Sequence, residues 1–143
     1  LLTDLLAQGY VPTVSPPMLA DDDTAVNADA DRVAALLAGA LDAELVLLTD
    51  VEGIYADPDD PDTLIEEAST PAAFEELQAA AAGFMSRKVH AAEEALAGGA
   101  SGVVVSDATH RKPLLAALAG HGTWIDPAAV QEGAAAATGG ESA

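Results

Sequence analysis

A short, continuously apolar run constrains the fold more than any other feature of this chain. Residues 44–48 read Glu-Leu-Val-Leu-Leu, which is too short and too uniformly apolar for an amphipathic helix. Such a run is typical of a strand buried on both faces, as in a parallel sheet that helices cover. A turn follows at once, Thr49-Asp50-Val51-Glu52-Gly53-Ile54-Tyr55. Ligands of open α/β sheets bind outside the carboxyl ends of the strands, so this turn is a candidate nucleotide site. The alternative interpretation is a polar turn that merely ends the strand.

The rest of the chain alternates between strand-like and helix-like segments. This alternation predicts an α/β fold with a mostly parallel sheet sandwiched by helices. We expect strands over 10–15, 44–49, 102–106 and 123–125, and helices over 28–42, 86–97 and 112–119, with one more beginning at Thr70. Residues 18–25 read as a polar hairpin or loop. In the helix 28–42 we expect one apolar, buried face made of Val33, Leu36, Leu37, Ala40 and Leu41.

The length of 143 residues predicts one domain. We assign residues 1–126 to it, and expect a disordered tail over 127–143, where Ala, Gly, Glu and Ser follow one another without periodicity. The chain has no starting Met, and its first residues read as the middle of an amphipathic helix. We therefore expect it to be the back part of a longer protein.

The charge balance narrows the class of protein. The chain has 24 Asp and Glu against 5 Lys and Arg, a formal net charge of −19, and no cysteine. We do not expect the chain to bind nucleic acid, because it has no basic patch to neutralise phosphates. Without cysteine there are no disulfides and no thiolate metal sites, and no apolar run is long enough to span a membrane. We expect a cytosolic protein from a salt-loaded, halophilic cell; an acidic binding module is the alternative.

Lys88 stands at an electrostatically poor place for a cation. With Arg87 it occupies the first turn of the helix expected over 86–97, where the helix dipole disfavours positive charge. A helix N-terminus with a fixed ammonium group facing an anion is what a phosphate site requires. A simple ion pair with a nearby acid is the other interpretation. Asn27 and Asp29, at the start of the helix 28–42, likewise read either as helix caps or as residues facing a phosphate-transfer site.

Four segments in order resemble the C-terminal half of the amino acid kinase family. They are Tyr10-Val11-Pro12-Thr13-Val14-Ser15, Asn27-Ala28-Asp29, Leu48-Thr49-Asp50-Val51-Glu52-Gly53-Ile54-Tyr55 and Gly83-x-Met85-x-x-Lys88, with a Gly-Thr-x-Ile finish at 122–125. The resemblance covers roughly residues 1–125. It is strongest to acetylglutamate kinases and to their archaeal relatives that act on glutamate or 2-aminoadipate held by the amino-group carrier protein LysW.

The resemblance implies ATP and Mg²⁺ as cofactors and a role for each motif. Lys88 would stabilise the charge on the phosphoryl group in flight, Asp29 would organise the lysines around it, and Asn27 would contact the substrate. The nucleotide would contact Thr49, Asp50, Val51, Gly53, Ile54, Tyr55, Ala80, Gly83 and Met85. The resemblance implies no metal-ligating residue in this chain. The missing N-terminal half would carry the other lysine, the substrate-binding arginine and the contacts of a homo-oligomer, so this chain alone would be inactive.

Three alternatives stay open for the activity. Ala25 stands where many acetylglutamate kinases resembling this stretch have a second asparagine, which favours a carrier-bound acceptor over free N-acetylglutamate. The Asp-Val-Glu-Gly-Ile-Tyr turn followed by an Asp-Pro loop also resembles uridylate kinase. A regulatory, nucleotide-sensing module without catalytic activity is the third possibility.

The charge leads to a first prediction. At a net charge of −19, self-repulsion opposes the compact state in dilute salt, and molar salt shortens the Debye length to about 3 Å. We expect cooperative folding to need about molar KCl, as followed by circular dichroism. Cooperative unfolding of the same protein in dilute buffer would contradict the halophile interpretation.

Overall fold

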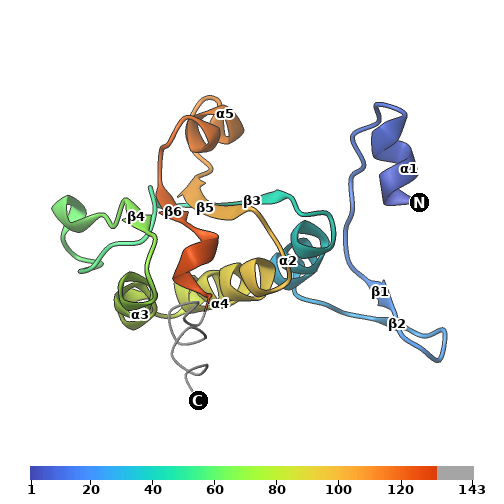
Figure 1. Ribbon diagram of the computed structural model, residues 1–143, viewed down its shortest axis with the longest axis horizontal. Helices are drawn as coiled ribbons and strands as arrows, with labels where there is room; N and C mark the ends of the chain where they lie inside the picture. The colour runs from blue at the N-terminus through green and yellow to red at the C-terminus, as the bar shows by residue number, and fades with distance from the viewer. Residues whose placement is uncertain (132–143) are drawn as a thin grey trace, which may run out of the picture.

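The computed structural model describes residues 1–131 and has a four-stranded sheet at its centre (Figure 1). The strand order is β3-β5-β6-β4, with β3 at Glu44–Thr49, β5 at Gly102–Asp107, β6 at Thr123–Ile125 and β4 at Glu67–Ala68. The pairs β3–β5 and β4–β6 are parallel, and β5–β6 is antiparallel. The predicted α/β class is confirmed, and β3 covers the strand expected over 44–49. The expected burial of this strand on both faces is wrong: β3 lies at the edge of the sheet, and Leu45 and Leu47 are buried whereas Leu48 is 37% exposed.

Helices cover both faces of this sheet (Figure 1). Helices α2 (Ala30–Ala40), α3 (Pro71–Ala80) and α4 (Phe84–Ala97) share one face, and α5 (Pro113–Leu118) lies on the other. Since successive strand residues point to opposite faces, Leu45 and Leu47 join the main core with the three helices. On the opposite face Val104 is buried together with Ala116 and Ala117 of α5.

The buried face of α2 is not the one that the sequence predicted. Leu36 is 60% exposed and Ala40 is exposed, whereas Ala35, Ala38 and Gly39 are buried. The reason is the close approach of α2 to α4. A Cβ atom added to Gly39 would lie 3.0 Å from the carbonyl carbon of Gly98. Only small side chains fit at this contact, so the alanines face α4 and the larger leucine turns outward.

The first 26 residues form elements that bury little. Helix α1 (Leu2–Ala7) has no buried residue, and β1 (Met18–Leu19) pairs with β2 (Ala25–Val26) in an antiparallel hairpin. The hairpin was one of the two forms expected for 18–25. The strand expected over 10–15 is wrong, because residues 10–15 have no ladder partner within residues 1–131. A strand requires a neighbour to accept and donate its backbone hydrogen bonds.

Other boundaries differ in detail. The two-residue strand β4 and the 3₁₀ turn at Pro61–Thr63 were not expected, and α4 begins at Phe84 rather than Ser86. The expected tail starts inside a second 3₁₀ turn, Pro127–Ala129, where Ala129 is buried. Residues 132–143 of that tail lie outside the described part. Within residues 1–131, no helix has the length and apolarity needed to cross a bilayer.

Gly102, at the start of β5, offers a test of this packing. A Cβ atom there would overlap the ring of Trp124 on the neighbouring strand β6. We expect Gly102→Ala in the full-length protein to lower the free energy of unfolding by about 1–3 kcal/mol, the usual range for overpacking. Urea titration followed by circular dichroism measures the change. The neighbouring exposed Ser101→Ala is the control, with an expected change within about 0.5 kcal/mol. Equal stability of the two variants would disprove the packing described here.

Candidate functional site

The turn after β3 is held in place by a residue that the sequence analysis did not single out. The buried Thr123 hydroxyl accepts a hydrogen bond from the Ile54 amide at 2.8 Å and donates one to the Ile65 carbonyl at 2.6 Å. A Cβ atom at Gly53 would lie 2.7 Å from the same hydroxyl oxygen. Glycine is therefore required at this position, because the turn passes directly over Thr123. Only the Gly-Thr-x-Ile finish of the sequence pointed toward this residue.

An apolar cavity of about 190 Å³ opens beside this turn. It is lined by Val51, Gly53, Ile54, Tyr55, Pro58, Ala80, Ala82 and Met85. The lining therefore combines the turn with the end of α3 and the start of α4. Its volume is below the roughly 300 Å³ at which pockets for whole drug-sized ligands begin. The cavity is suited to a flat ring rather than to an entire nucleotide.

Six of the nine residues expected to contact a nucleotide line this one cavity: Val51, Gly53, Ile54, Tyr55, Ala80 and Met85. The other three lie next to it in the chain. The Thr49 hydroxyl donates to the Asp50 carboxylate at 3.2 Å at the carboxyl end of β3. Gly83 is the N-cap of α4 and has φ of +58°, a conformation that side chains other than glycine rarely adopt. The positive φ lets the chain break between α3 and α4.

Lys88 lies in the first turns of α4 and contacts an aspartate of α2. Its Nζ atom lies 3.0 Å from Oδ2 of Asp31, and the Lys88 side chain is only 17% exposed. Helix α4 has no side-chain cap at Gly83, and its Met85 amide donates to the Ala82 carbonyl at 3.1 Å. A partly buried ammonium group therefore lies near a helix N-terminus and is paired with Asp31. This ion pair is the contact that the alternative interpretation of Lys88 expects, and the phosphate role of Lys88 stays a prediction.

Asp29 caps a helix in this structure, whereas the resemblance implied that it organises the lysines around the phosphoryl group. Its carboxylate caps α2 and accepts hydrogen bonds from the amides of Asp31 at 3.0 Å and Arg32 at 3.2 Å. The carboxylate that touches Lys88 belongs to Asp31, a residue that the sequence analysis did not choose. The sequence Asp29-Ala30-Asp31 alone does not show which aspartate caps the helix and which one contacts Lys88. Asn27 is exposed, directly after β2.

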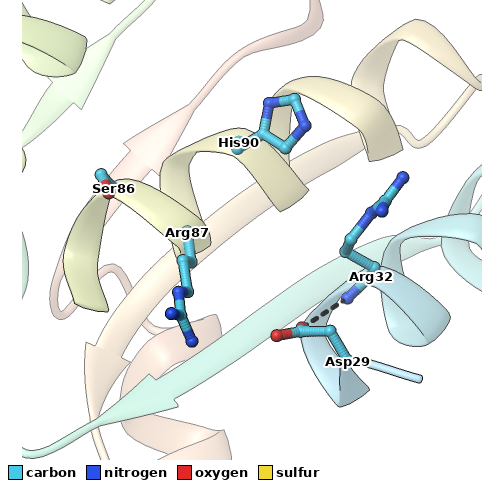
Figure 2. Close-up of a pocket in the computed structure, with 5 residues that line it drawn as sticks. All are labelled: Asp29, Arg32, Ser86, Arg87 and His90. Carbon is cyan, nitrogen blue, oxygen red and sulfur yellow. Dashed lines mark hydrogen bonds between the residues drawn. The ribbon is translucent and has the colours of Figure 1, made fainter. Parts of the chain in front are cut away.

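A second pocket, of about 400 Å³, lies between the starts of α2 and α4. Asp29, Arg32, Ser86, Arg87 and His90 line it, and Arg87 extends from α4 toward the start of α2 (Figure 2). Beside it Arg32 binds Glu94 of α4 through two hydrogen bonds of 2.7 and 3.0 Å. The hydrogen bond from Arg32 lowers the pKa of Glu94, and the same bond raises the pKa of Arg32. This ion pair ties α2 to α4.

Residues 1–131 contain no group of three or more His, Cys, Asp or Glu side chains arranged to hold a metal ion. Mg²⁺ in nucleotide sites is usually held by one or two carboxylates together with the phosphates. Asp31, near Lys88, and the exposed Asp50, at the end of β3, are carboxylates of the kind that such a site uses.

Comparison with known proteins decides the family. The model of the amino acid kinase family matches residues 1–107. The chain belongs to the amino acid kinase family. Relatives within it include the [LysW]-aminoadipate kinases of Deinococcus radiodurans, 44% identical over 126 residues, and Thermus thermophilus, 43% identical over 127 residues. The acetylglutamate kinase of Methanopyrus kandleri is 44% identical over 110 residues.

The match covers most of this chain but less than half of each of these amino acid kinases. The alignments with the two [LysW]-aminoadipate kinases take in 87% of this chain and 43% and 47% of the relatives' lengths, and that with the acetylglutamate kinase takes in 75% and 44%. Among solved structures, N-acetylglutamate synthase from Neisseria gonorrhoeae, complexed with coenzyme A and L-arginine, superposes with a TM-score of 0.64 at 30% identity. That superposition covers 75% of this chain and 25% of the synthase chain.

Two substitutions of Asp29 distinguish the contribution of its helix-capping oxygen to stability from that of its negative charge. We expect Asp29→Ala to lower the free energy of unfolding of the full-length protein by about 1 kcal/mol, the usual cost of removing a helix N-cap. Asp29→Asn keeps a capping oxygen, so its unfolding free energy should stay close to that of the parent. Urea denaturation measures both, with Asp21→Ala in the exposed β1–β2 loop as control. A loss for Asp29→Asn as large as that for Asp29→Ala would mean that the charge, not the cap, matters there.

Proposed function

We propose that this chain is the nucleotide-binding part of a cytosolic, ATP-dependent carboxylate kinase. The proposal rests on one arrangement. An apolar, ring-sized cavity lies beside the turn 50–55 and is partly lined by Met85 of α4. The same helix carries the partly buried Lys88, which is paired with Asp31. The base of ATP fits the cavity through Tyr55 and the aliphatic residues around it. The phosphates then run toward the uncapped start of α4.

The chemistry needs charge stabilisation more than proton transfer. A carboxylate acceptor is already ionised at neutral pH, so no general base is required. ATP supplies the phosphoryl group, and its transfer depends on alignment and on cations that neutralise the developing charge. Lys88, near the start of α4, supplies that stabilisation in this chain.

Asp31 rather than Asp29 is our choice for the carboxylate that orients Lys88. The 3.0 Å contact fixes the ammonium group near the start of α4. Asp29 is engaged as the cap of α2 while its side chain lines the 400 Å³ pocket. We assign Asn27 and Asp29 to the acceptor side of the site. Thr49, Asp50 and Gly83 remain proposed nucleotide contacts just outside the cavity.

The acceptor that we propose is glutamate or 2-aminoadipate bound to a LysW-type carrier protein, in arginine or lysine biosynthesis. The names of the Deinococcus and Thermus relatives support it. Free N-acetylglutamate is the second candidate, since acetylglutamate kinases are equally similar in identity. The proposed enzyme is the longer polypeptide that contains this chain, and assembly into homo-oligomers through its other half is part of the proposal.

A substrate panel tests the function. The full-length protein, in molar KCl with Mg-ATP, is offered carrier-bound glutamate, carrier-bound aminoadipate, N-acetylglutamate and UMP, and acyl phosphates are trapped with hydroxylamine. We expect hydroxamate from a carrier-bound substrate. Hydroxamate from N-acetylglutamate alone would replace the acceptor. ADP from UMP without hydroxamate would overturn the carboxylate chemistry, and no turnover of any substrate would favour a nucleotide-sensing module.

Two variants connect the activity to the site. Lys88→Met should lower turnover by about a hundredfold or more, as loss of one charge-stabilising donor does elsewhere. Asp31→Asn should lower turnover more than Asp29→Asn, because only Asp31 touches Lys88. Unchanged turnover of Lys88→Met would remove this lysine from the mechanism.

A further inference from the structure

A short antiparallel ladder beside the cavity is interrupted by a side chain from another strand. The ladder joins residues 54–56, which include the end of the turn, to residues 63–65. The Ile65 amide donates to the Ile54 carbonyl at 2.8 Å, and in a regular antiparallel pair the Ile54 amide would donate back to the Ile65 carbonyl. The Thr123 hydroxyl lies between these two groups instead and bonds to both, at 2.8 and 2.6 Å. The hydroxyl group therefore holds the ladder open at its end nearest the turn.

Thr123 reaches this position because the residue before it is glycine. A Cβ atom at Gly122 would overlap the Val105 carbonyl oxygen of β5, so only glycine lets the backbone lie this close to β5 at the start of β6. Thr123 itself has no exposed surface. Its contacts therefore lie entirely within this part of the polypeptide, and nothing that packs against the outside of the chain can reach the hydroxyl group.

A hydroxyl group at this place does what an apolar side chain of the same size cannot do. Valine would fill nearly the same volume, but the Ile54 amide and the Ile65 carbonyl would lose their shared partner. A buried backbone group without a hydrogen bond costs free energy, so the two groups would bond to each other directly or take up water. In either case the turn would leave its place over Thr123.

We propose that Thr123 is a positioning residue for the nucleotide, and that its hydroxyl group sets the width of the base cavity. It acts through Ile54, which lines the cavity together with its neighbours Gly53 and Tyr55. Because it is buried, the hydroxyl group itself does not touch the nucleotide. A cavity wall that is ordered before ATP arrives makes binding tighter, since ATP does not have to order it. The inference rests on the proposed function and adds one residue to the nucleotide side of the site.

The test measures KM for ATP, KM for the acceptor and kcat in the full-length kinase. Thr123→Val should raise KM for ATP about tenfold, because ATP then has to order the turn itself. KM for the acceptor and kcat at saturating ATP should stay within about twofold of the parent, as expected when only uniform binding of the nucleotide is lost. Thr123→Ser keeps the hydroxyl group and should keep KM for ATP close to that of the parent.

Thr109→Val is the matched control. It removes a threonine hydroxyl that donates to Asp107 at 2.9 Å, away from the residues that line the cavity, and should change none of the three constants. A fall in kcat or a rise in KM for the acceptor as large as the rise in KM for ATP would indicate general loosening of the fold and would overturn the inference. Unchanged KM for ATP in a folded Thr123→Val variant would overturn it as well.

A substitution on the turn itself keeps the test decisive if Thr123→Val fails to fold. A Cβ atom at Gly53 would lie 2.7 Å from the Thr123 hydroxyl oxygen, so Gly53→Ala pushes the turn away from that hydroxyl group and should raise KM for ATP. In a Thr123→Ala background the same substitution should raise it less, because the atom that it meets is gone. Unchanged KM for ATP in Gly53→Ala, or equal effects in the two backgrounds, would contradict the proposed role of Thr123.

The outcomes also separate the role of Thr123 from the proposed function. If the parent enzyme forms an acyl phosphate while Thr123→Val and Gly53→Ala leave KM for ATP unchanged, the inference fails and the proposed function stands. A parent protein that neither binds nor turns over ATP would remove the proposed function and this inference together.

Discussion

The close contact between α2 and α4 is the constraint on which the rest of the site depends. Alanines and glycines at this contact let the two helices approach until Gly39 meets Gly98. At the other end of the same contact Lys88 meets Asp31, and Arg32 meets Glu94. Larger residues in the middle would separate the helices and with them the two charged groups. Packing among the smallest side chains therefore positions the most polar ones.

Much of the fold could be predicted because its signals are local. The apolar run at 44–48, the threonine and proline at the start of α3, and the glycines around β5 each mark an element through its own residues. The strand expected over 10–15 failed because strand formation depends on a neighbour, which local composition does not reveal. The buried face of α2 was misjudged for a related reason: hydrophobicity ranked leucine above alanine, while the partner helix admitted only small side chains.

In the candidate site, too, the features with local sequence signals were predicted and those that depend on distant residues were not. The turn 49–55 and the start of α4 were found from residue types, and five of their residues that were predicted to contact the nucleotide line one cavity together with Ala80. The choice between Asp29 and Asp31 could not be made, because both aspartates stand at the start of one helix. Only the position of Lys88, which comes from a helix far along the chain, separates them. Thr123 stood in the Gly-Thr-x-Ile finish, but its role was missed because nothing in the local sequence shows which backbone groups a buried hydroxyl will bind.

The buried threonine has one more consequence. Trp124, the single tryptophan of the chain, is the next residue, and its ring lies against Gly102. Thr123 is bonded to the turn that borders the cavity, and Trp124 follows it on the same strand, with its ring on the opposite face. The molecule thus carries one intrinsic fluorophore beside the residue that anchors the turn, with no second tryptophan in the chain to obscure the signal.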